Sequence, residues 1–447
     1  MRPQTISTTP CLKLLILLIL ETSFGIFNDM KHYEAKMLAL PIKSQVIHSG
    51  YLPRPPNKLR FQHNVSLTVS ITVGTPPQNV SMVIDTGSEL SWLHCNTTTT
   101  NPVNRLIPAP FFNPNHSSSY SPISCSSPTC MTRTRDFPIP ASCDSNNLCH
   151  ATLSYADSSS SEGNLASDTF GFGSSNNPGI VFGCMNSSYS TNLDTDSNTT
   201  GLMGMNLGSL SLVSQLKIPK FSYCISGSDF SGILLLGESN LSWVGSLNYT
   251  PLVRISTPLP YFDRAAYTVR LKGIKVSDKL LNISGTAFVP DHTGAGQTMF
   301  DLGTQFTFLL GPVYNVLRDE FLSQTNNTLR LLDDPSFVFQ IAMDLCYRIP
   351  TNQSKLPDLP SVSLVFEDAE MRVSGEQLLY RVPGLVRGSD SVYCFTFGNS
   401  DLLGVEAFLI GHHQQQNMWM EFDLVEFRVG LGHARCDLIG QNVLGLG

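Results

Sequence analysis

Charged residues are scarce in this sequence, and long runs of one kind of side chain are missing from most of it. Lysine, arginine, aspartate and glutamate make up 14% of the 447 residues, and the formal net charge is −7. The sequence has no long basic run, which is the usual pattern of a chain that binds nucleic acid. Beyond the first 25 residues, no apolar run reaches the roughly 18 residues that a membrane-spanning helix needs. We therefore expect no nucleic-acid partner and a soluble mature chain.

The one marked apolar run lies close to the N-terminus. Arg2 and Lys13 precede "LLILLIL", and small or polar residues follow it. This order predicts a signal peptide over residues 1–25 that is removed from the mature protein. A signal anchor is the alternative, but the apolar run is short for one. We therefore expect the secretory pathway and no membrane contact after signal removal. The destination is the extracellular space or apoplast, with the vacuole or endoplasmic reticulum as alternatives.

Cysteine number and glycosylation sequons agree with secretion. Eleven cysteines are present, and ten remain once Cys11 leaves with the signal peptide, which predicts five disulfides in an oxidising compartment. For Cys125, Cys130, Cys143 and Cys149, with His150 beside them, a zinc site is the alternative, but secreted thiols do not stay reduced. We therefore expect no metal and no cofactor. Glycosylation is predicted at the sequons Asn64, Asn79, Asn96, Asn115, Asn186, Asn198, Asn240, Asn248, Asn282, Asn326 and Asn352.

The segment 26–60 differs in charge from the rest of the chain. Its lysines and arginines outnumber its acids, and it ends in the turn-rich "YLPRPPNKLR". A basic leader before an acidic body predicts a propeptide that covers an acidic site and is later removed. A disordered linker is the alternative.

From residue 61 onward the pattern predicts β-strands. "NVSLTVSITVG" alternates apolar and polar residues, "GTPPQ" marks a turn, and short apolar runs such as "ILLLG" and "MWMEFDL" recur to the end. Helical patterns are few, namely "LGSLSLVSQL" and "GPVYNVLRDEFLSQ". The sequence therefore predicts an all-β protein with few short helices. Residues 96–150, which are rich in Ser, Thr, Asn and Pro and hold four cysteines, read as an insertion.

Two segments far apart in the chain repeat one pattern. "MVIDTGSELSW" places Asp85 at the end of an apolar strand, and "MFDLGTQFTF" does the same for Asp301. Each is followed, more than a hundred residues later, by an apolar-apolar-Gly segment, first "GLMGMN" and then "FLIGHH". We therefore expect two lobes of similar plan, 61–245 and 246–440, that each donate one Asp-turn to a shared cleft.

Two carboxylates held close together predict general acid–base chemistry. They cannot both ionise cheaply, so at mildly acidic pH they share one proton. The ionised carboxylate can then activate a water while the protonated one donates to a substrate carbonyl. Gly87 and Gly303 let backbone N–H groups approach, and Ser88 and Thr304 can donate to the carboxylates. No metal or cofactor is required.

These paired motifs resemble the pepsin-type aspartic endopeptidases, and within them the plant nepenthesin-like branch, from about residue 66 to Cys436. The resemblance implies a bilobal fold, a protein or peptide substrate and a monomer. It also implies that Tyr155, in "SYADSSSSEG", is a flap tyrosine that bonds to the indole of Trp92; Gly163 and the serine run fit a mobile hairpin. The implied disulfides are Cys95–Cys184, Cys125–Cys149, Cys130–Cys143, Cys224–Cys436 and Cys346–Cys394.

Leu302 departs from the family pattern. The residue after each Asp is normally Thr or Ser, whose hydroxyl bonds across to the opposite turn; Thr86 retains this hydroxyl and Leu302 lacks it. A buried backbone group left without a partner costs roughly 1–3 kcal/mol. We therefore expect a weakened but intact support of the acid pair, and a gain in stability when serine replaces Leu302.

The pattern leaves two functions open. The first is a secreted endopeptidase that acts at acidic pH. The second is a non-catalytic binding protein on the same fold, like the plant inhibitors of cell-wall glycosidases. Since those usually lose an Asp-turn and this chain keeps both, the endopeptidase is favoured. The adjacent His412 and His413 are expected to lie in a loop without a chemical role, since neighbouring strand side chains face opposite ways.

Overall fold

The structure is a computed structural model that describes residues 37–46, 65–96, 111–156, 159–189, 199–227, 231–238, 245–353 and 355–443. Met1–Met37 and Leu38–Gly447 form separate units, and the description below concerns the second. The predicted signal peptide lies outside the described residues, as do most of the leader and the part of the insertion at 97–110.

Strands dominate the described residues, as the alternating sequence patterns predict. The three described α-helices are α2 (Leu212–Gln215), α3 (Gly311–Thr325) and α4 (Cys436–Val443). The first two lie within the segments expected to be helical, and Pro312 occupies the first turn of α3, where its missing N–H costs nothing. Short helical turns are η1 (Pro114–His116), η2 (Thr129–Arg133), η3 (Gly285–Phe288), η4 (Gly375–Gln377) and η5 (Ser400–Leu403). The all-β prediction is confirmed.

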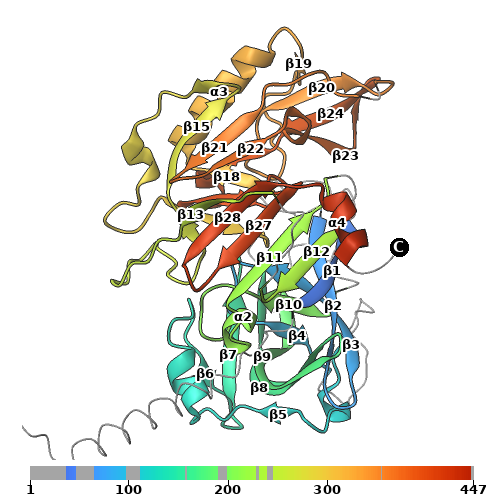
Figure 1. Ribbon diagram of the computed structural model, residues 1–447, viewed down its shortest axis with the longest axis vertical. Coiled ribbons are helices and arrows are strands. Elements are labelled where there is room, and N and C mark those ends of the chain that lie inside the picture. Colours follow the sequence, from blue (N-terminus) through green and yellow to red (C-terminus); the bar gives the residue numbers. More distant parts are fainter. Residues whose placement is uncertain are drawn as a thin grey trace, which may run out of the picture. The chain divides into compact units, whose positions relative to one another are not determined.

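The largest sheet contains fifteen strands and joins both halves of the chain (Figure 1). Its order is β13 (Asn248–Pro251), β28 (Arg428–His433), β27 (Met418–Asp423), β11 (Lys220–Ile225), β12 (Gly232–Leu236), β1 (Leu38–Val46), β2 (Val65–Val73), β3 (Gln78–Asp85), β10 (Gly201–Gly204), β4 (Trp92–His94), β9 (Ser175–Tyr189), β8 (Ser160–Phe172), β7 (Cys149–Ser154) and β6 (Ser142–Cys143), with β5 (Ser121–Pro122) paired to β8. The red strands β27 and β28 lie beside the green strands β11 and β12 in Figure 1.

Three smaller sheets are built from the C-terminal half. One contains β14 (Thr268–Val269), β17 (Gln297–Asp301), β26 (Ala407–Gly411), β18 (Thr307–Leu309) and β25 (Phe397–Asn399). Another contains β16 (Lys279–Leu280), β15 (Leu271–Val276), β21 (Val362–Phe366) and β22 (Glu370–Val373). The third contains β19 (Arg330–Leu331), β20 (Cys346–Pro350), β24 (Asp390–Phe395) and β23 (Leu379–Arg387).

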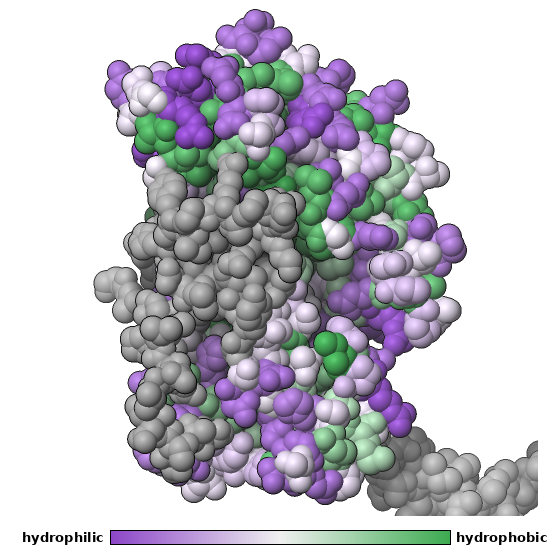
Figure 2. Space-filling model, turned by 180° about the vertical axis from the view of Figure 1, so that it is seen from behind, coloured by the Kyte–Doolittle hydropathy of each residue, from purple (hydrophilic) through white to green (hydrophobic). Residues whose placement is uncertain are grey.

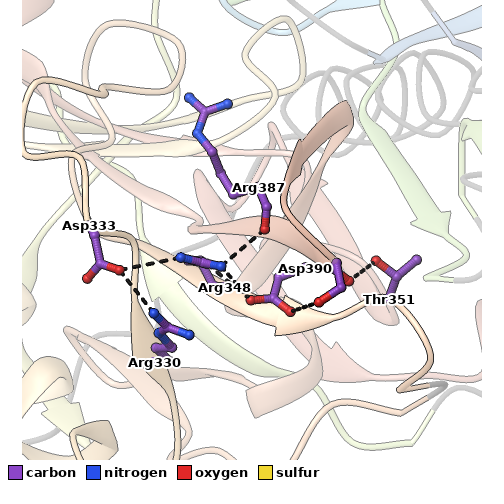
Figure 3. Close-up of polar contacts among 7 residues, drawn as sticks. Arg330, Asp333, Arg348, Thr351, Arg387 and Asp390 are labelled. Carbon is purple, nitrogen blue, oxygen red and sulfur yellow. Dashed lines mark hydrogen bonds and ion pairs between the residues drawn. The ribbon is translucent and has the colours of Figure 1, made fainter.

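The third small sheet carries a charged cluster that Figure 3 shows in close-up. Arg348 binds Asp390 at 2.9 Å and also donates to the carbonyl of Arg387 at 3.1 Å. Asp333 lies 3.4 Å from Arg348 and 3.2 Å from Arg330. Because β20 also bonds to β24 through the Cys346–Cys394 disulfide, covalent and ionic links hold these strands together.

Both halves of the chain build the same three-strand motif around an aspartate. β3 runs parallel to β10, and the register pairs Asp85 with Gly204. β17 runs parallel to β26, and the register pairs Asp301 with Gly411. In each motif a third strand, β4 or β18, runs antiparallel to the glycine-containing strand. The repeated sequence pattern is thus a repeated structure, in which apolar strands end at an Asp-turn.

Strand β1 comes from the leader that the sequence assigns to residues 26–60. It pairs with β12 through Leu38–Ile42 and with β2 through Lys43–Val46, so it joins two parts of the large sheet. Leu40 and Ile42 are buried in the main core. This part of the leader is therefore built into the fold rather than lying over its surface.

The main core is continuous through both halves and consists of aliphatic and aromatic side chains. Phe221, Tyr267 and Phe422 form a ring cluster in which Phe221 and Phe422 stack with centroids 4.7 Å apart. On the face shown in Figure 2, green apolar residues lie in small groups among purple and white ones. Burial of these apolar side chains is the main source of stability, at about 25 cal/mol per Å² removed from water.

Five disulfides form, and the pairing of two corrects the prediction. Cys95–Cys184, Cys224–Cys436 and Cys346–Cys394 agree with the resemblance. In the insertion, the predicted pairs Cys125–Cys149 and Cys130–Cys143 are wrong, because the structure joins Cys125 to Cys143 and Cys130 to Cys149. Cys149 is fully buried and meets the buried Cys130, whereas Cys143 is exposed. With all four thiols in disulfides, none is left for zinc.

The predicted glycosylation sequons that the structure describes lie at the surface. Asn96 is half-buried, and exposed asparagines are Asn79, Asn115, Asn186, Asn248, Asn282, Asn326 and Asn352. The side chains of Asn64, Asn198 and Asn240 lie outside the described residues. Every described sequon is thus open enough to accept a glycan, and glycosylation itself stays a prediction.

Candidate active site

Asp85 and Asp301 face one cleft, because each is the last residue of the strand that runs parallel to the glycine-containing strand of its motif. β3 ends at Asp85 and β17 ends at Asp301. Both side chains line a cavity of about 490 Å³ together with the turn residues Gly87, Ser88, Gly303 and Thr304. This volume is within the usual range for a ligand site. The structure therefore brings together the two aspartates that the sequence pairs.

The two carboxylates are held by matching sets of donors. Gly87 N–H donates to Oδ1 of Asp85 at 2.7 Å, and Ser88 Oγ donates to its Oδ2. Gly303 N–H donates to Oδ1 of Asp301 at 2.9 Å, and Thr304 Oγ1 donates to its Oδ2 at 2.5 Å. Since each carboxylate is fixed by one backbone and one hydroxyl donor, the pair has a local two-fold arrangement.

The glycine after each turn lies against the opposite carboxylate. A Cβ built on Gly87 would lie 3.0 Å from Oδ1 of Asp301, and one built on Gly303 would lie 2.5 Å from Oδ1 of Asp85. A methyl group therefore does not fit at residue 303 without moving the carboxylate. Glycine is required here because the two Asp-turns approach so closely.

Burial and the neighbouring carboxylate keep a proton on the pair. Burial, and after it the charge of Asp301, raise the pKa of Asp85 from 3.8 to about 7, although the donors Ser88 and Gly87 act in the opposite direction. Desolvation disfavours the ionised form, and a second negative charge close by does the same. The site thus holds one acid and one base across the mildly acidic range.

Thr86 braces the two turns from the N-terminal side. Its hydroxyl accepts from Leu302 N–H at 2.9 Å and donates to the carbonyl of Phe300 at 3.3 Å. Thr86 is fully buried, and Leu302 is 2% exposed within the main core. Leu302 has no hydroxyl with which to return these bonds, as the sequence indicated, but its own N–H is satisfied. Its side chain contributes to the core instead.

This burial reverses the expected effect of Leu302→Ser on stability. A new hydrogen bond adds about 0.5–1.5 kcal/mol, whereas truncating a buried leucine costs about 2–5 kcal/mol. We therefore expect Leu302→Ser to lower the free energy of unfolding and the melting temperature. Leu302→Ala is the matched control, because it leaves a similar cavity without the hydroxyl. If the serine hydroxyl bonds across the interface, the free energy of unfolding of Leu302→Ser should exceed that of Leu302→Ala by about 0.5–1.5 kcal/mol. A serine variant that is less stable than the alanine variant would show that residue 302 makes no such bond.

Tyr155 and Trp92 form the contact that the resemblance implies. Trp92 Nε1 donates to the Tyr155 hydroxyl at 2.5 Å, and both residues line the cleft. Tyr155 follows β7, and its N–H bonds to the carbonyl of Ser159, where β8 is about to begin. Gly163 plays a different part from the one expected. It lies inside β8 at a bulge, where a Cβ would come within 2.2 Å of the Cys184 carbonyl, so it permits close strand packing.

His412 and His413 lie in the buried turn after β26 and do not line the cleft. His413 Nε2 lies 2.9 Å from the carbonyl of Gln377, and its ring packs on Phe306. Burial lowers the pKa of His413 to about 4, so it is neutral through most of the acidic range. Among the residues that the structure describes, no three His, Cys, Asp or Glu side chains gather as a metal site.

Several cleft residues were not anticipated from the sequence. Glu89, Asp263 and the segment 136–139 line the cavity with the aspartate pair. Glu89 accepts a bond from Leu210 N–H at 2.8 Å, and burial raises its pKa. Glu89 lies only four residues after Asp85, and this short distance in sequence could have indicated that it lies in the cleft. The 136–139 segment gave none, because it reaches the cleft only through the fold.

Comparison with known proteins identifies relatives over most of the chain. Two family models match, "Xylanase inhibitor N-terminal" over residues 67–238 and "Xylanase inhibitor C-terminal" over residues 266–432. The chain is 64% identical to aspartic proteinase PCS1 of Arabidopsis thaliana, over 92% of this chain and 90% of that protein. It is 34% identical to aspartic proteinase nepenthesin-1 of Nepenthes gracilis, over 82% of this chain and 77% of that protein.

Solved structures agree on the fold. The chain resembles the crystal structure of edgp with a TM-score of 0.64 at 20% identity, covering 91% of this chain and 96% of that one. It resembles basic 7S globulin from soybean with a TM-score of 0.62 at 19% identity, covering 90% and 97%. At this level of identity the similarity concerns the arrangement of strands.

Proposed function

Since the chain belongs to the pepsin-type aspartic proteinases and is an aspartic-type endopeptidase, we propose that it hydrolyses peptide bonds at acidic pH through Asp85 and Asp301. The observation that carries this proposal is the matching pair of donor sets on the two carboxylates. They fix two acids in one cleft, and burial keeps a proton on the pair. Protein or peptide substrates follow from the family, and a monomer from the same resemblance.

The geometry supports a direct attack by water. A water between the carboxylates gives one proton to the ionised carboxylate, and its oxygen attacks the carbonyl carbon of the scissile bond. The protonated carboxyl donates its proton to the carbonyl oxygen, which forms a neutral diol. The carboxyl that took the proton of the water gives it to the departing nitrogen, a diol hydroxyl returns its proton to the other carboxylate, and the C–N bond breaks to give an acid and an amine. The pair of carboxylates then again holds a single proton.

Tyr155 serves in this proposal as the flap residue above the substrate. Its bond to Trp92 holds the phenol at the edge of the cleft. A lid that closes over a bound peptide excludes water and strengthens the electrostatic contacts inside. The backbone bond between Tyr155 and Ser159 supports a hairpin at this point.

A non-catalytic binding protein is the second candidate. Its supporting observation is that the matching family models carry the name of xylanase inhibitors. Against it, both aspartates and all four of their donors are present, and Thr86 bridges the turns. A protein that only binds has no need of a pair of acids held at this cost in desolvation.

We further propose that the chain is a secreted glycoprotein made as a zymogen, with the signal peptide at 1–25 and the propeptide within 26–60. Five disulfides and exposed sequons support an oxidising compartment. Across the described stretches, no helix has the length and apolar character needed to cross a membrane. The pairing of β1 with β2 and β12 limits processing, because release of β1 would expose two strand edges.

The deciding experiment is a protein-cleavage assay between pH 3 and pH 8, with and without pepstatin. We expect pepstatin-sensitive cleavage that is highest in acid and is lost as the pH rises through about 7, where the pair loses its proton. Pepstatin is an apt probe because it occupies the space between two such carboxylates. Purified mature protein that binds pepstatin but cleaves nothing at any pH would favour the binding-protein alternative.

A further inference from the structure

The disulfide-bonded insertion contributes one wall of the substrate cleft. Within the insertion, Asp136, Phe137, Pro138 and Ile139 line the same cavity as Asp85 and Asp301. We call these four residues the 136–139 segment. Its place beside the aspartate pair, far from the repeated Asp-turns in sequence, raises the question of what it does there.

The segment is held rigidly at its base. Cys125–Cys143 and Cys130–Cys149 staple the chain on either side of it. Phe137 is 6% exposed and belongs to the cluster that contains Leu90 and Trp92. Tyr155 packs on the same cluster. The segment and the proposed flap therefore share one apolar support, so the position of each depends on the other.

The segment is also tied to the C-terminal half of the chain. Asp136 forms an ion pair with Arg264 at 2.8 Å, and Arg264 lies between β13 and β14. Arg133, just before the segment, donates to the carbonyl of Ser209 at 2.5 Å. Next to Arg264, Ala265 accepts a bond from Leu207 N–H at 2.7 Å. The ion pair and the Leu207–Ala265 bond bridge the two halves, whereas the Arg133 bond stays within the N-terminal half, so the 136–139 segment is anchored to both halves beside the cleft.

Ile139 is the large apolar side chain of the segment that stays exposed. Ile139 is 42% exposed although it is a large apolar residue at the cavity wall. An apolar side chain that stays exposed on a rigid wall gains stability when a ligand covers it, at about 25 cal/mol per Å². An acidic side chain would lose its hydration against the same apolar surface, and the nearby Glu89 offers it no attraction.

We propose that the 136–139 segment is a specificity wall, at which Ile139 contacts a large apolar side chain of the substrate peptide. The inference rests on the proposed endopeptidase function and adds a determinant of side-chain preference. Phe137 and the Asp136–Arg264 pair position the wall, and Ile139 makes the contact. Leucine, isoleucine, methionine or phenylalanine fits this surface, and aspartate or glutamate does not.

The test compares Ile139→Lys with wild type on peptides that differ at single positions on either side of the scissile bond. Each position carries leucine in one peptide and glutamate in another, and kcat/KM is measured for both. At one position we expect the leucine-to-glutamate ratio to fall by about tenfold or more, since contacts of this size are worth 10- to 200-fold in discrimination. Other positions should keep their ratios.

Met131→Lys is the matched control. Met131 is 58% exposed in the same insertion and does not line the cleft. The same charge change there should leave every ratio as in wild type. Far-UV circular dichroism and pepstatin binding verify that both variants fold and keep the aspartate pair in place.

The outcomes separate the wall from the proposed function. If wild type cleaves and Ile139→Lys keeps every leucine-to-glutamate ratio, or Met131→Lys alters the same one, the wall is wrong and the endopeptidase stands. If wild type cleaves no peptide, the proposed function fails. The specificity wall is then tested by the Kd of the leucine and glutamate peptides for wild type and for Ile139→Lys. If the substitution changes the Kd of both peptides by the same factor, the specificity wall is wrong.

Discussion

Asp85→Asn and Asp301→Asn are each expected to lower kcat/KM for a peptide substrate by about a thousandfold or more. General acid–base catalysis by a positioned group contributes about 10²- to 10⁴-fold, and here either substitution removes the acid–base pair itself. Asparagine keeps the shape of the side chain, and one oxygen remains to accept from the turn. The measurement is kcat/KM at acidic pH for both purified variants, with folding followed by circular dichroism.

The same substitution at Asp85 should change how stability depends on pH. The pKa of this buried carboxyl is about 7 in the folded chain against an ordinary 3.8, so the folded state binds more protons between these values. Stability from this group is therefore complete below about pH 4 and is lost as the pH rises through 7. Asp85→Asn removes that loss. We expect its melting temperature to exceed that of wild type near pH 7 and to match it more closely near pH 4.

Asp291→Asn provides the control for both measurements. Asp291 is an exposed loop residue outside the cleft, where its carboxylate accepts bonds from Thr293 and Ala295. It should retain wild-type kcat/KM. Substantial pepstatin-sensitive cleavage by either cleft variant would refute the proposed pair, and a melting curve for Asp85→Asn with the pH dependence of wild type would refute its buried proton.

The paired Asp-turns could be predicted because their determinants are local. An apolar strand that ends in Asp, followed by Gly and a hydroxyl residue, specifies both the turn and the donors to the carboxylate. For Asp85–Ser88 and Asp301–Thr304, the structure has the turn and the hydrogen-bond donors to the carboxylate that the sequence predicts. The apolar-apolar-Gly segments were also informative, since they pair with the Asp strands in the same register in both halves.

Features that depend on distant contacts were beyond the sequence. Four cysteines within 25 residues allow three pairings, and the choice depends on which thiols the fold brings together. The burial of Leu302 reverses the change in stability that the sequence predicts for Leu302→Ser. The sequence around Leu302 shows neither its exposure nor its neighbours in space. Strand β1 was hidden for the same reason, since a basic leader gives no sign that Leu40 and Ile42 complete a sheet.

Ile139 shows the same limit at the functional site. Nothing in "DFPIP" distinguishes a surface turn from a cleft wall. Its position follows from two disulfides, from the burial of Phe137 and from the ion pair to Arg264 across the chain. The proposed specificity wall thus belongs to a segment that shares no pattern with the residues that carry the chemistry.

Gly303→Ala is expected to lower kcat by about a hundredfold, although the variant stays folded. The added Cβ would lie 2.5 Å from Oδ1 and 2.6 Å from Cγ of Asp85, closer than real Cβ contacts allow. Because hydrogen bonds from Ser88 and Gly87 fix this carboxylate, it cannot turn away without breaking them. Displacement of a reacting group by about 1 Å costs on the order of 10²-fold in rate. The measurement is kcat and KM at acidic pH.

Two other glycines make this prediction a graded one. A Cβ on Gly87 would lie 3.0 Å from Oδ1 of Asp301, which a small shift can absorb, and one on Gly285 would meet nothing within 4 Å. We therefore expect the loss of kcat to be greatest for Gly303→Ala, smaller for Gly87→Ala and absent for Gly285→Ala. Melting temperatures identify any loss that comes from unfolding instead. If all three variants have the same kcat, the two Asp-turns do not approach as closely as this geometry requires. The acid pair would then function with its two carboxylates farther apart.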